Sequence, residues 1–404
     1  MKYIIILGDG MADEPIEKLG GKTPLMAANK PNIDRLAKLG RNGFLSTVPL
    51  DMPAGSEIAN MGVLGYDVHK VYEGRGVLEA ASMGVEIKEG DLGLRCNLIC
   101  IEDKKIKNHS AGHISNEEAA ELIEYLNQKL GSETVTFYPG VSYRHLLVIK
   151  GGKKQLKCTP PHDVPGTPSL DVMVEATDSV AKETADLLND LILKSQELLA
   201  GHPINVARIQ KGKDAANSIW PWSPGFKPQM PTLDEMYGVG KSAVISAVDL
   251  IQGIGVYAGM EVLKVEGATG LYNTNYEGKA QAAINALKGD TNFVYLHIEA
   301  SDEAGHEGDV ELKTKTIEYL DSRIVKPIVE AAKELSEPLA IAILPDHPTP
   351  CAIRTHTHNA IPFVIYYPNE VADSVEAYDE ESAKAGDYGV LSGNEFIKAF
   401  LNTH

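Results

Sequence analysis

Several features are scarce in this sequence of 404 residues, and each scarcity excludes a class of protein. Four cysteines are too few for a disulfide scaffold, and Cys96 and Cys100 lack a second pair that would complete a zinc knuckle. We therefore expect reduced thiols. No apolar run approaches the length of a transmembrane helix, and the five apolar residues after Lys2 are too few for a secretory signal. These absences predict a cytoplasmic protein with no membrane partner.

Positive charge is in deficit. The chain has 38 lysines and arginines against 56 acidic residues, and its net charge is −18. Binding to nucleic acid or to an anionic membrane needs an excess of basic residues, so neither is expected as a partner. An anionic substrate would instead need metal ions and a local basic pocket. The Gly-x4-Gly-Lys-Ser/Thr sequence of P-loop kinases is absent as well.

Three apolar segments of the chain are each followed by an aspartate. Such segments predict buried strands, and open α/β sheets place their chemistry at the carboxyl ends of strands. We therefore expect the three carboxylates to meet at one edge of a sheet. The segments are Tyr3–Leu7, Asn292–Ile298 and Leu339–Leu344, and the aspartates are Asp9, Asp302 and Asp346.

Histidines lie close to two of these aspartates. His306 follows Asp302 by four residues, a spacing that puts both side chains on one face of a helical turn. His347 follows the third aspartate directly, and His356 and His358 come soon after. A single pair of this kind is more often solvated than bound to a metal. Three acidic strand ends in one chain favour a metal centre.

Ser56 lies between Gly55 and Glu57, where a loop is expected to turn into a helix. The N-terminus of a helix offers free N–H groups and the positive end of the helix dipole, which suits a serine that receives a phosphoryl group. The other interpretation is that Ser56 only caps the helix. The residues around it leave both interpretations open.

The order of predicted elements indicates two domains. A doubly wound α/β domain with a mostly parallel sheet is expected from residues 1–77 and 236–404, and an inserted, smaller α+β domain from residues 78–235. Within the insert we expect a helix from Ser115 to about Leu130, a long helix over 170–199, a strand over 205–209 and a linker or lid over 211–231.

Basic residues in the turns of the insert are candidates for binding an anionic substrate. Arginine is favoured among them because its planar guanidinium matches carboxylate and phosphate oxygens, although solvated loops are the common alternative for each one. Lys241, at the return to the first domain, is a further candidate for contact with a phosphate. The residues in the insert are His113, Arg144, His162, Arg208 and Lys213.

Six segments along the whole chain resemble the 2,3-bisphosphoglycerate-independent phosphoglycerate mutases of the archaeal type, within the alkaline phosphatase superfamily. They are Asp9-Gly-Met, Gly55-Ser-Glu-Ile-Ala-Asn60, Gly65-Tyr-Asp67, Ser301-Asp-Glu-Ala-Gly-His306, Pro345-Asp-His-Pro-Thr-Pro350 and His356-Thr-His-Asn-Ala-Ile-Pro362. The resemblance implies an alkaline phosphatase-like core and a reaction that moves a phosphoryl group from a small phosphorylated substrate to Ser56 and back.

The resemblance also implies two divalent metal ions. One would be held by Asp302, His306 and His356, with His358 as the alternative to His356, and the other by Asp9, Asp346, His347 and the Ser56 oxygen. Mixed carboxylate and imidazole ligands suit Mn²⁺ or Zn²⁺, and Mg²⁺ suits them less well. The insert would supply a lid that excludes water.

Two residues depart from the pattern of that family. Glu57 and Asn60 stand where an aspartate and a histidine are more usual, and a related branch with an asparagine there has been proposed to act as a homoserine kinase. Three interpretations follow: a phosphoglycerate mutase, a metal-dependent phosphotransferase or phosphatase acting on another small alcohol, and a metal-binding protein without catalysis. The first is the function we expect.

Overall fold

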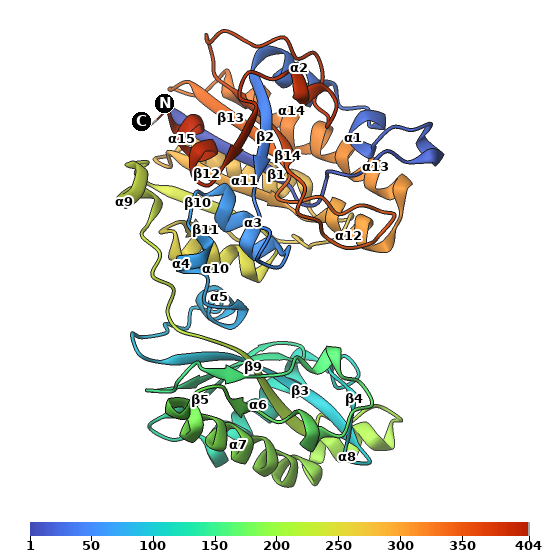
Figure 1. Ribbon diagram of the computed structural model, residues 1–404, viewed down its shortest axis with the longest axis vertical. Coiled ribbons are helices and arrows are strands. Elements are labelled where there is room, and N and C mark those ends of the chain that lie inside the picture. The colour runs from blue at the N-terminus through green and yellow to red at the C-terminus, as the bar shows by residue number, and fades with distance from the viewer. Residues whose placement is uncertain (403–404) are drawn as a thin grey trace. The chain divides into compact units, whose positions relative to one another are not determined.

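The computed structural model describes residues 1–402 and divides the chain into two compact units (Figure 1). The core unit consists of Met1–Tyr72 and the segment that begins at Gln229, and the inserted unit is Glu73–Pro228. The two points where the chain passes from one unit to the other each lie a few residues before the domain boundaries expected from the sequence. No helix in the described part of the chain is long and apolar enough to span a bilayer.

The core unit is built on one eight-stranded sheet, with strand order β11-β10-β12-β1-β13-β14-β2-β15. The expectation of a mostly parallel α/β sheet is confirmed, but β14 runs antiparallel to both β13 and β2. The strands are β1 (Lys2–Gly8), β2 (Arg41–Ser46), β10 (Ser242–Ile245), β11 (Glu261–Val262), β12 (Phe293–Ile298), β13 (Leu339–Leu344), β14 (Ile361–Tyr366) and β15 (Val390–Ser392).

The register of the three central strands decides where the polar residues lie. β1 pairs in parallel with β12 and with β13, and Leu7 lies beside both His297 and Leu344. The residues that follow these strands therefore leave the sheet at the same edge. Asp9 and Asp346 are two of them, which is the geometry that the strand-end pattern predicts.

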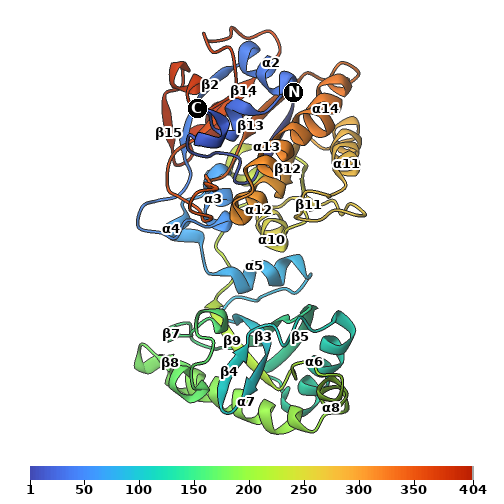
Figure 2. The same ribbon diagram turned by 90° about the vertical axis from the view of Figure 1, so that its right-hand side faces the viewer.

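Helices cover both faces of this sheet. In Figure 2, α11, α13 and α14 lie on one face of the sheet, and α3 lies on the other. The helices are α1 (Pro24–Ala27), α2 (Pro31–Leu39), α3 (Ser56–Val63), α4 (Val68–Val71), α9 (Leu233–Tyr237), α10 (Asp249–Tyr257), α11 (Tyr276–Lys288), α12 (Ala300–Glu307), α13 (Val310–Tyr319), α14 (Lys326–Ala332) and α15 (Glu395–Leu401).

Aromatic side chains attach α15 to its face of the sheet. The ring of Phe396 lies 5.0 Å from that of Phe363 on β14, and the ring of Phe400 lies 5.6 Å from that of Tyr3 on β1. Both phenylalanines of the helix are fully buried. Burial of each contributes about 1.5–3 kcal/mol, so this contact suffices to hold a helix of two turns against the sheet.

The helical segment after α13 is irregular near Pro327. A π-helical turn, Leu320–Val325, separates α13 from α14, and the proline stands in the first turn of α14. Proline has no N–H and its ring clashes with the carbonyl four residues earlier, so the regular bonding pattern cannot continue through this point.

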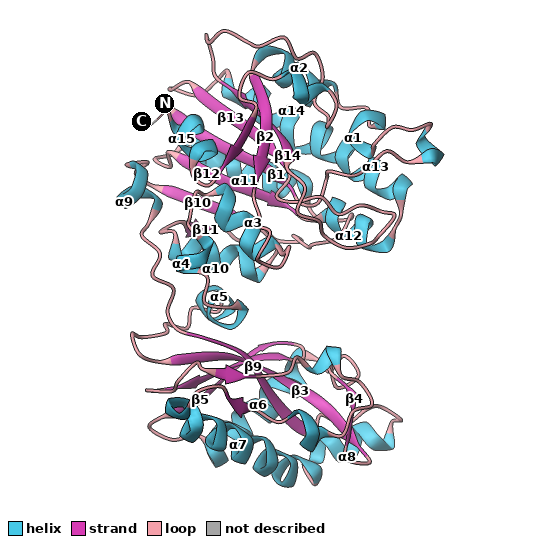
Figure 3. Cartoon of the chain, in the orientation of Figure 1, coloured by secondary structure: helices cyan, strands magenta, loops and turns pink. Residues whose placement is uncertain are grey.

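The inserted unit has its own antiparallel sheet, with strand order β4-β3-β6-β5 and β9 paired to β3 (Figure 3). Helices α6 and α7 share its main hydrophobic core, and α5 packs through Val77 and Ala80 against Leu146 and Val148. The elements are α5 (Arg75–Ser82), β3 (Leu92–Glu102), β4 (Lys105–Asn108), α6 (Asn116–Leu130), β5 (Val135–Val141), β6 (Arg144–Ile149), β7 (Leu156–Lys157), β8 (Glu175–Ala176), α7 (Lys182–Ala200), α8 (Pro203–Gln210) and β9 (Ser218–Gly225).

Three expectations for the insert are wrong. Residues 205–209 form part of a helix, α8, which starts with Pro203 in its first turn, where the missing N–H costs nothing. The long helix starts at Lys182, after short 3₁₀ turns. The stretch 211–231 is no linker, because it contains β9. This strand tolerates its prolines because β3 is its single partner among the described strands.

Both tryptophans of the chain lie in β9, and the structure explains their place there. Trp220 and Trp222 are buried, and their indole N–H groups donate to the Thr159 carbonyl at 2.9 Å and to Asn97 Oδ1 at 3.0 Å. A buried indole needs such a partner for its N–H. The abundance of proline and glycine around the tryptophans therefore misled the sequence interpretation.

Lys313 on α13 connects two loops of the core unit. Its side chain is fully buried, and its ammonium donates to the carbonyls of Ala12 at 3.0 Å and Thr349 at 2.8 Å and pairs with Asp13 at 2.9 Å. These loops directly follow β1 and β13, so this one cation holds together the two segments that begin with Asp9 and Asp346.

We expect Lys313→Met to lower the free energy of unfolding by about 3–5 kcal/mol, because it leaves the Asp13 carboxylate buried without a counter-charge. Chemical denaturation followed by circular dichroism measures the change. Lys315→Met is the matched control, since Lys315 lies on the same helix but pairs with Glu318 at the surface, and it should change stability little. Equal effects of the two substitutions would contradict the role given to Lys313.

Candidate active site

Four of the predicted site residues lie buried at the carboxyl edge of the core sheet. Asp9 follows β1, Asp302 lies in the first turn of α12 just after β12, and Asp346 and His347 follow β13. Their placement needs no unusual backbone, because parallel strands in register deliver the residues after them to one edge. The structure thus brings together the side chains that the strand-end pattern indicates.

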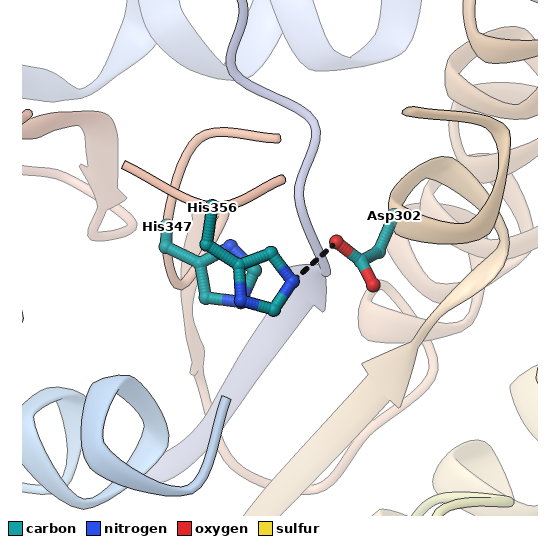
Figure 4. A group of neighbouring side chains, drawn as sticks. All are labelled: Asp302, His347 and His356. Carbon is teal, nitrogen blue, oxygen red and sulfur yellow. Dashed lines mark ion pairs between the residues drawn. The ribbon is translucent and has the colours of Figure 1, made fainter. Parts of the chain in front are cut away.

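Asp302 is the centre of a first group of ligand atoms. Its Oδ1 lies 3.3 Å from His356 Nε2 (Figure 4). Its Oδ2 lies 3.2 Å from His306 Nε2. The two imidazole Nε2 atoms are 2.9 Å apart. His347 stacks on His356 with ring centroids 3.8 Å apart, and one nitrogen of each lies within 4.8 Å of a carboxylate oxygen of Asp302. Carboxylate and imidazole atoms at such spacing suit a divalent metal ion.

Backbone carbonyls orient the histidines of this group. His306 Nδ1 lies 3.0 Å from the Arg354 carbonyl, and His356 Nδ1 lies 2.8 Å from the Ala54 carbonyl. A carbonyl only accepts, so each Nδ1 carries a proton and donates it. This leaves both Nε2 atoms directed toward Asp302, which is the arrangement in which a second hydrogen bond prepares an imidazole for a metal.

The ionisation of the group reflects these contacts. The hydrogen bond with Asp302 raises the pKa of His306 to about 9 against the opposing effect of burial. Burial alone would raise the pKa of Asp302, but hydrogen bonds from His306 and His356 outweigh it, and the pKa of this carboxyl is lowered. The carboxylate therefore stays ionised and available as a ligand.

The second group contains Asp9, Asp346, His347 and Ser56. Asp346 Oδ1 accepts the backbone N–H of Gly10 at 3.2 Å and that of His347 at 2.9 Å. His347 Nε2 lies 3.1 Å from Ser56 Oγ, 3.4 Å from Asp346 Oδ2 and 3.6 Å from Asp9 Oδ1. One nitrogen thus faces the hydroxyl and both carboxylates.

Asp9 shows that this second group suits a cation. Its Oδ1 is buried and has no hydrogen-bond partner. Burial, followed by the charges of Asp346 and Asp302, raises the pKa of Asp9 well above its usual range. A buried carboxylate oxygen without a partner is costly, and a bound cation would both satisfy it and reduce the repulsion among the three acids.

Ser56 is the first residue of α3, and the residue that caps this helix is Gly55. The interpretation of Ser56 as an N-cap is therefore wrong. Its hydroxyl instead faces His347, and its backbone is in the first turn, where free N–H groups and the positive end of the dipole favour an anion. Of the two alternatives from the sequence, the arrangement fits the phosphoryl-accepting one.

Of the two candidate histidines in the loop after β13, the structure directs His356 into the first group. His358 Nε2 instead lies 2.7 Å from the Met52 carbonyl. The preference for His356 over His358 thus agrees with the geometry.

Sequence reasoning missed several polar residues around the two groups. His297 in β12 lies 2.9 Å from Asp9 Oδ2, and Glu299 has a carboxylate oxygen within 4.8 Å of oxygens of Asp9 and Asp302. Burial, followed by nearby acids, raises the pKa of Glu299 to about 8. A histidine inside an otherwise apolar strand, one residue before its end, was a signal that the strand pattern contained.

Asn60, one of the two departures from the family pattern, links Ser56 to the second group. Its Nδ2 donates to the Ser56 carbonyl at 2.8 Å and to Asp346 Oδ2 at 2.9 Å, and its Oδ1 accepts the Tyr295 hydroxyl at 2.5 Å. The side chain is fully buried. Asn60 thus joins the helix of the serine to the carboxylate through buried hydrogen bonds.

Two of the predicted substrate-binding residues have other roles. Arg208 is buried in the inserted unit, where it pairs with Glu118 and donates to the carbonyls of Asp214 and Ala111. Lys241 precedes β10, which runs parallel to β12, so it lies at the amino edge of the sheet, about 15 Å or more from the carboxyl edge. Its ammonium pairs with Asp290 at 2.9 Å. Both expectations are corrected.

The other four predicted substrate-binding residues lie in turns or at strand ends of the inserted unit. Arg144 begins β6 and its guanidinium lies 5.9 Å from the ring of Tyr143. His162 lies in a 3₁₀ turn, with its ring 5.3 Å from that of Trp222. His113 and Lys213 are exposed. Their roles stay predictions.

The fold and the site define an α/β protein in which a serine and two groups of carboxylates and histidines meet at the edge of the sheet. A model of the family described as 2,3-bisphosphoglycerate-independent phosphoglycerate mutase matches residues 37–205. A relative of that name from Methanosarcina barkeri is 51% identical over 399 residues, 98% of each chain. The relative from Methanothermobacter thermautotrophicus that carries the number 2 is 43% identical and covers all of this chain and 98% of its own.

Solved structures agree with these sequence matches. A structure from Pyrococcus horikoshii superposes with a TM-score of 0.83 at 31% identity, covering 99% of this chain and 97% of its own. The cofactor-independent phosphoglycerate mutase from Thermoplasma acidophilum gives a TM-score of 0.72 at 27% identity, covering 100% and 99%. The chain belongs to the 2,3-bisphosphoglycerate-independent phosphoglycerate mutase family.

We expect Mn²⁺ to stabilise the metal-stripped protein, because a cation relieves the repulsion among the buried carboxylates. At a free Mn²⁺ concentration 100 times the dissociation constant, the free energy of unfolding should rise by about 2.7 kcal/mol for each ion bound. Denaturation with and without Mn²⁺ measures the gain.

Asp302→Asn should lose much of this gain, since it removes the charge at the centre of the first group. Glu311→Gln is the control, because Glu311 is an exposed acid of the next helix and contacts only Lys18 among the described ion pairs. A Mn²⁺ effect that is the same in wild type and Asp302→Asn would place the stabilising ion elsewhere.

Proposed function

We propose that this protein interconverts 3-phosphoglycerate and 2-phosphoglycerate through a phosphoserine at Ser56. The observation that carries the proposal is the position of the Ser56 hydroxyl. It lies at the start of α3 and 3.1 Å from His347 Nε2, beside two groups of carboxylates and imidazoles. The names of the relatives support the choice of phosphoglycerate over other small phosphorylated substrates.

The residues of the site fit two divalent ions. Asp302, His306 and His356 would hold one, and Asp9, Asp346, His347 and the Ser56 oxygen would hold the other. The mixture of oxygen and nitrogen ligands supports Mn²⁺ or Zn²⁺ over Mg²⁺, and we favour Mn²⁺. When bound, such ions supply positive charge that offsets the charge of a phosphoryl group and lowers the pKa of a serine hydroxyl.

The chain itself supplies position and pre-organised polarity. The first turn of α3 holds Ser56 at the positive end of the helix dipole, and Asn60, one turn later, fixes that helix to Asp346 through a buried hydrogen bond. The hydroxyl therefore does not have to be ordered at the moment of reaction. Such prior placement is a large part of what an enzyme contributes to group transfer.

The reaction consists of two transfers. In the first, a bond forms between Ser56 Oγ and phosphorus as the bond from phosphorus to the substrate oxygen breaks, and the serine proton replaces the phosphoryl group on the substrate. In the second, the neighbouring hydroxyl of the bound glycerate takes the phosphoryl group and the serine regains a proton. The glycerate stays bound between the steps, so no free phosphate forms.

We infer that the inserted unit binds the substrate and excludes water during these steps. His113, Arg144, His162 and Lys213 are the candidates for its anion contacts. His162 lies beside the ring of Trp222 and Arg144 lies beside that of Tyr143, and neither forms a buried salt bridge among the described ion pairs, so both side chains are free to meet an anion. From this substrate we infer a role in glycolysis and a cytoplasmic location.

Two alternatives from the sequence are not favoured. A homoserine kinase-like transferase or a phosphatase would use the same serine and ligands. The relatives that cover nearly the whole chain at 43–51% identity carry the mutase name. Asn60, which departs from the family pattern, has a structural role through its buried hydrogen bonds, and this role implies no change of substrate.

We expect Ser56→Ala to reduce turnover of 3-phosphoglycerate by about a thousandfold or more while the fold is kept, because nucleophile and ligand oxygen are lost together. A coupled assay measures turnover. Wild-type protein quenched during reaction should carry phosphate on the peptide that contains Ser56, as read by mass spectrometry.

Ser46→Ala is the control, since Ser46 is an exposed serine at the end of β2 in the same unit. Near-normal turnover of Ser56→Ala would disprove the covalent route. Stoichiometric free phosphate would indicate a phosphatase, and label on Ser56 from ATP but not from phosphoglycerate would indicate a kinase.

A further inference from the structure

We propose that His297 is a positioning residue that fixes the orientation of Asp9, and that it is not itself a metal ligand. The proposal rests on the proposed metal centre. It assigns a role to a buried histidine that lies within reach of two carboxylates and that neither the strand-end pattern nor the expected ligand sets include.

His297 makes one contact with each of its ring nitrogens. It lies in β12 and is fully buried. Its Nε2 is 2.9 Å from Asp9 Oδ2, and its Nδ1 is 3.1 Å from the hydroxyl of Ser246, which follows β10. The three side chains thus form a line that crosses three adjacent strands, from β10 through β12 to β1.

The carboxylate of Asp9 decides which nitrogen of His297 carries the proton. An ionised carboxylate only accepts, so the imidazole proton lies on Nε2 and is donated to Asp9 Oδ2. His297 Nδ1 is then an acceptor, and it takes the hydroxyl proton of Ser246, whose Oγ also accepts the backbone N–H of Val248 at 3.0 Å. This assignment agrees with a neutral ring, which burial favours.

The consequence for Asp9 is that its two oxygens become different. Oδ2 is occupied by the proton of His297, whereas Oδ1 has no hydrogen-bond partner and lies 3.6 Å from His347 Nε2. Asp9 therefore presents one oxygen, in a fixed direction, to the second group of ligands. Hydrogen bonding behind a ligand carboxylate acts on the metal in this indirect way.

The geometry also argues against direct ligation by His297. Both ring nitrogens are already used, one as a donor to Asp9 and one as an acceptor from Ser246. Ligation through Nε2 would break the bond to Asp9 and leave two carboxylate oxygens without a partner in a buried site. Asp346, in contrast, is held by Gly10, His347 and Asn60, so its orientation does not depend on His297.

The test compares Mn²⁺ binding by the full chain carrying His297→Gln or His297→Leu with that of the wild type. Calorimetric titration of the metal-stripped proteins, with Mn²⁺ counted by electron paramagnetic resonance, gives the number of ions and each affinity. We expect two ions for every variant. His297→Leu should weaken one of the two sites by about 10–100-fold and leave the other unchanged.

His297→Gln should recover most of that loss, because its amide can place an N–H near the position of Nε2. Ser246→Ala should weaken the same site to a smaller extent, since it removes only the hydrogen bond that holds the imidazole at Nδ1. Ser246→Ala also keeps the test decisive if His297→Leu does not fold. His145→Asn is the control for loss of a buried histidine, because His145 lies in the inserted unit and accepts the Gly140 N–H through Nδ1.

Four outcomes would overturn the proposal. Unchanged Mn²⁺ affinity in both His297→Leu and Ser246→Ala would remove the positioning role while leaving the metal centre intact. Loss of one ion in both His297→Leu and His297→Gln would make His297 a ligand. If His297→Leu weakened both Mn²⁺ sites equally, or if His145→Asn weakened Mn²⁺ binding as well, the effect would be a general structural one. A wild-type chain that takes up no Mn²⁺ would overturn the metal centre itself and this inference with it.

Discussion

The constraint on which the core unit depends is the close approach of three buried carboxylates. Asp9, Asp302 and Asp346 come from three adjacent strands, and burial with mutual repulsion raises the pKa of Asp9 well above its usual range. No folded chain collects such groups cheaply, because each loses its hydration and gains like-charged neighbours. The cost falls if a cation joins them, and the unpartnered Oδ1 of Asp9 shows where it would join.

The surrounding structure serves to hold these carboxylates still. The parallel register of β1, β12 and β13 places the three carboxylates at the same edge of the sheet. Lys313 holds the loops after β1 and β13 together. Neutral hydrogen-bond donors fix individual carboxylate oxygens. His297 donates to Asp9 and Asn60 donates to Asp346. Because α3 is fixed to Asp346 by the same asparagine, the serine at its first position keeps a constant distance from both groups.

The sequence allowed the three aspartates of the site to be predicted because they obey a topological rule, whereas their division into two sets of metal ligands is implied by the family resemblance. Residues after parallel strands share an edge, so three apolar segments that end in aspartate indicate a site before any contact is known. Asp302 with His306, and Asp346 with His347, needed only the local geometry of a turn. These side chains are placed by the residues next to them in the chain.

The predictions that were wrong concern residues whose position depends on contacts with segments far away in the sequence. Arg208 was expected to bind substrate, but its partner Glu118 is 90 residues away in the chain, and nothing near Arg208 reveals it. β9 was taken for a linker because proline and glycine surround it, whereas its pairing with β3 fixes it as an edge strand. His297 was missed for the related reason that a histidine inside an apolar strand has meaning only once the facing strand is known.

The account is tested most directly by anomalous diffraction from crystals grown with Mn²⁺, which locates each ion without reference to activity. The account predicts two ions per chain. One should contact Asp302, His306 and His356, and the other should contact Asp9 Oδ1, Asp346, His347 and the Ser56 hydroxyl, with His297 still donating to Asp9 Oδ2. Two bound ions of which neither contacts Asp9 or Ser56, or a single ion bound elsewhere on the chain, would contradict it.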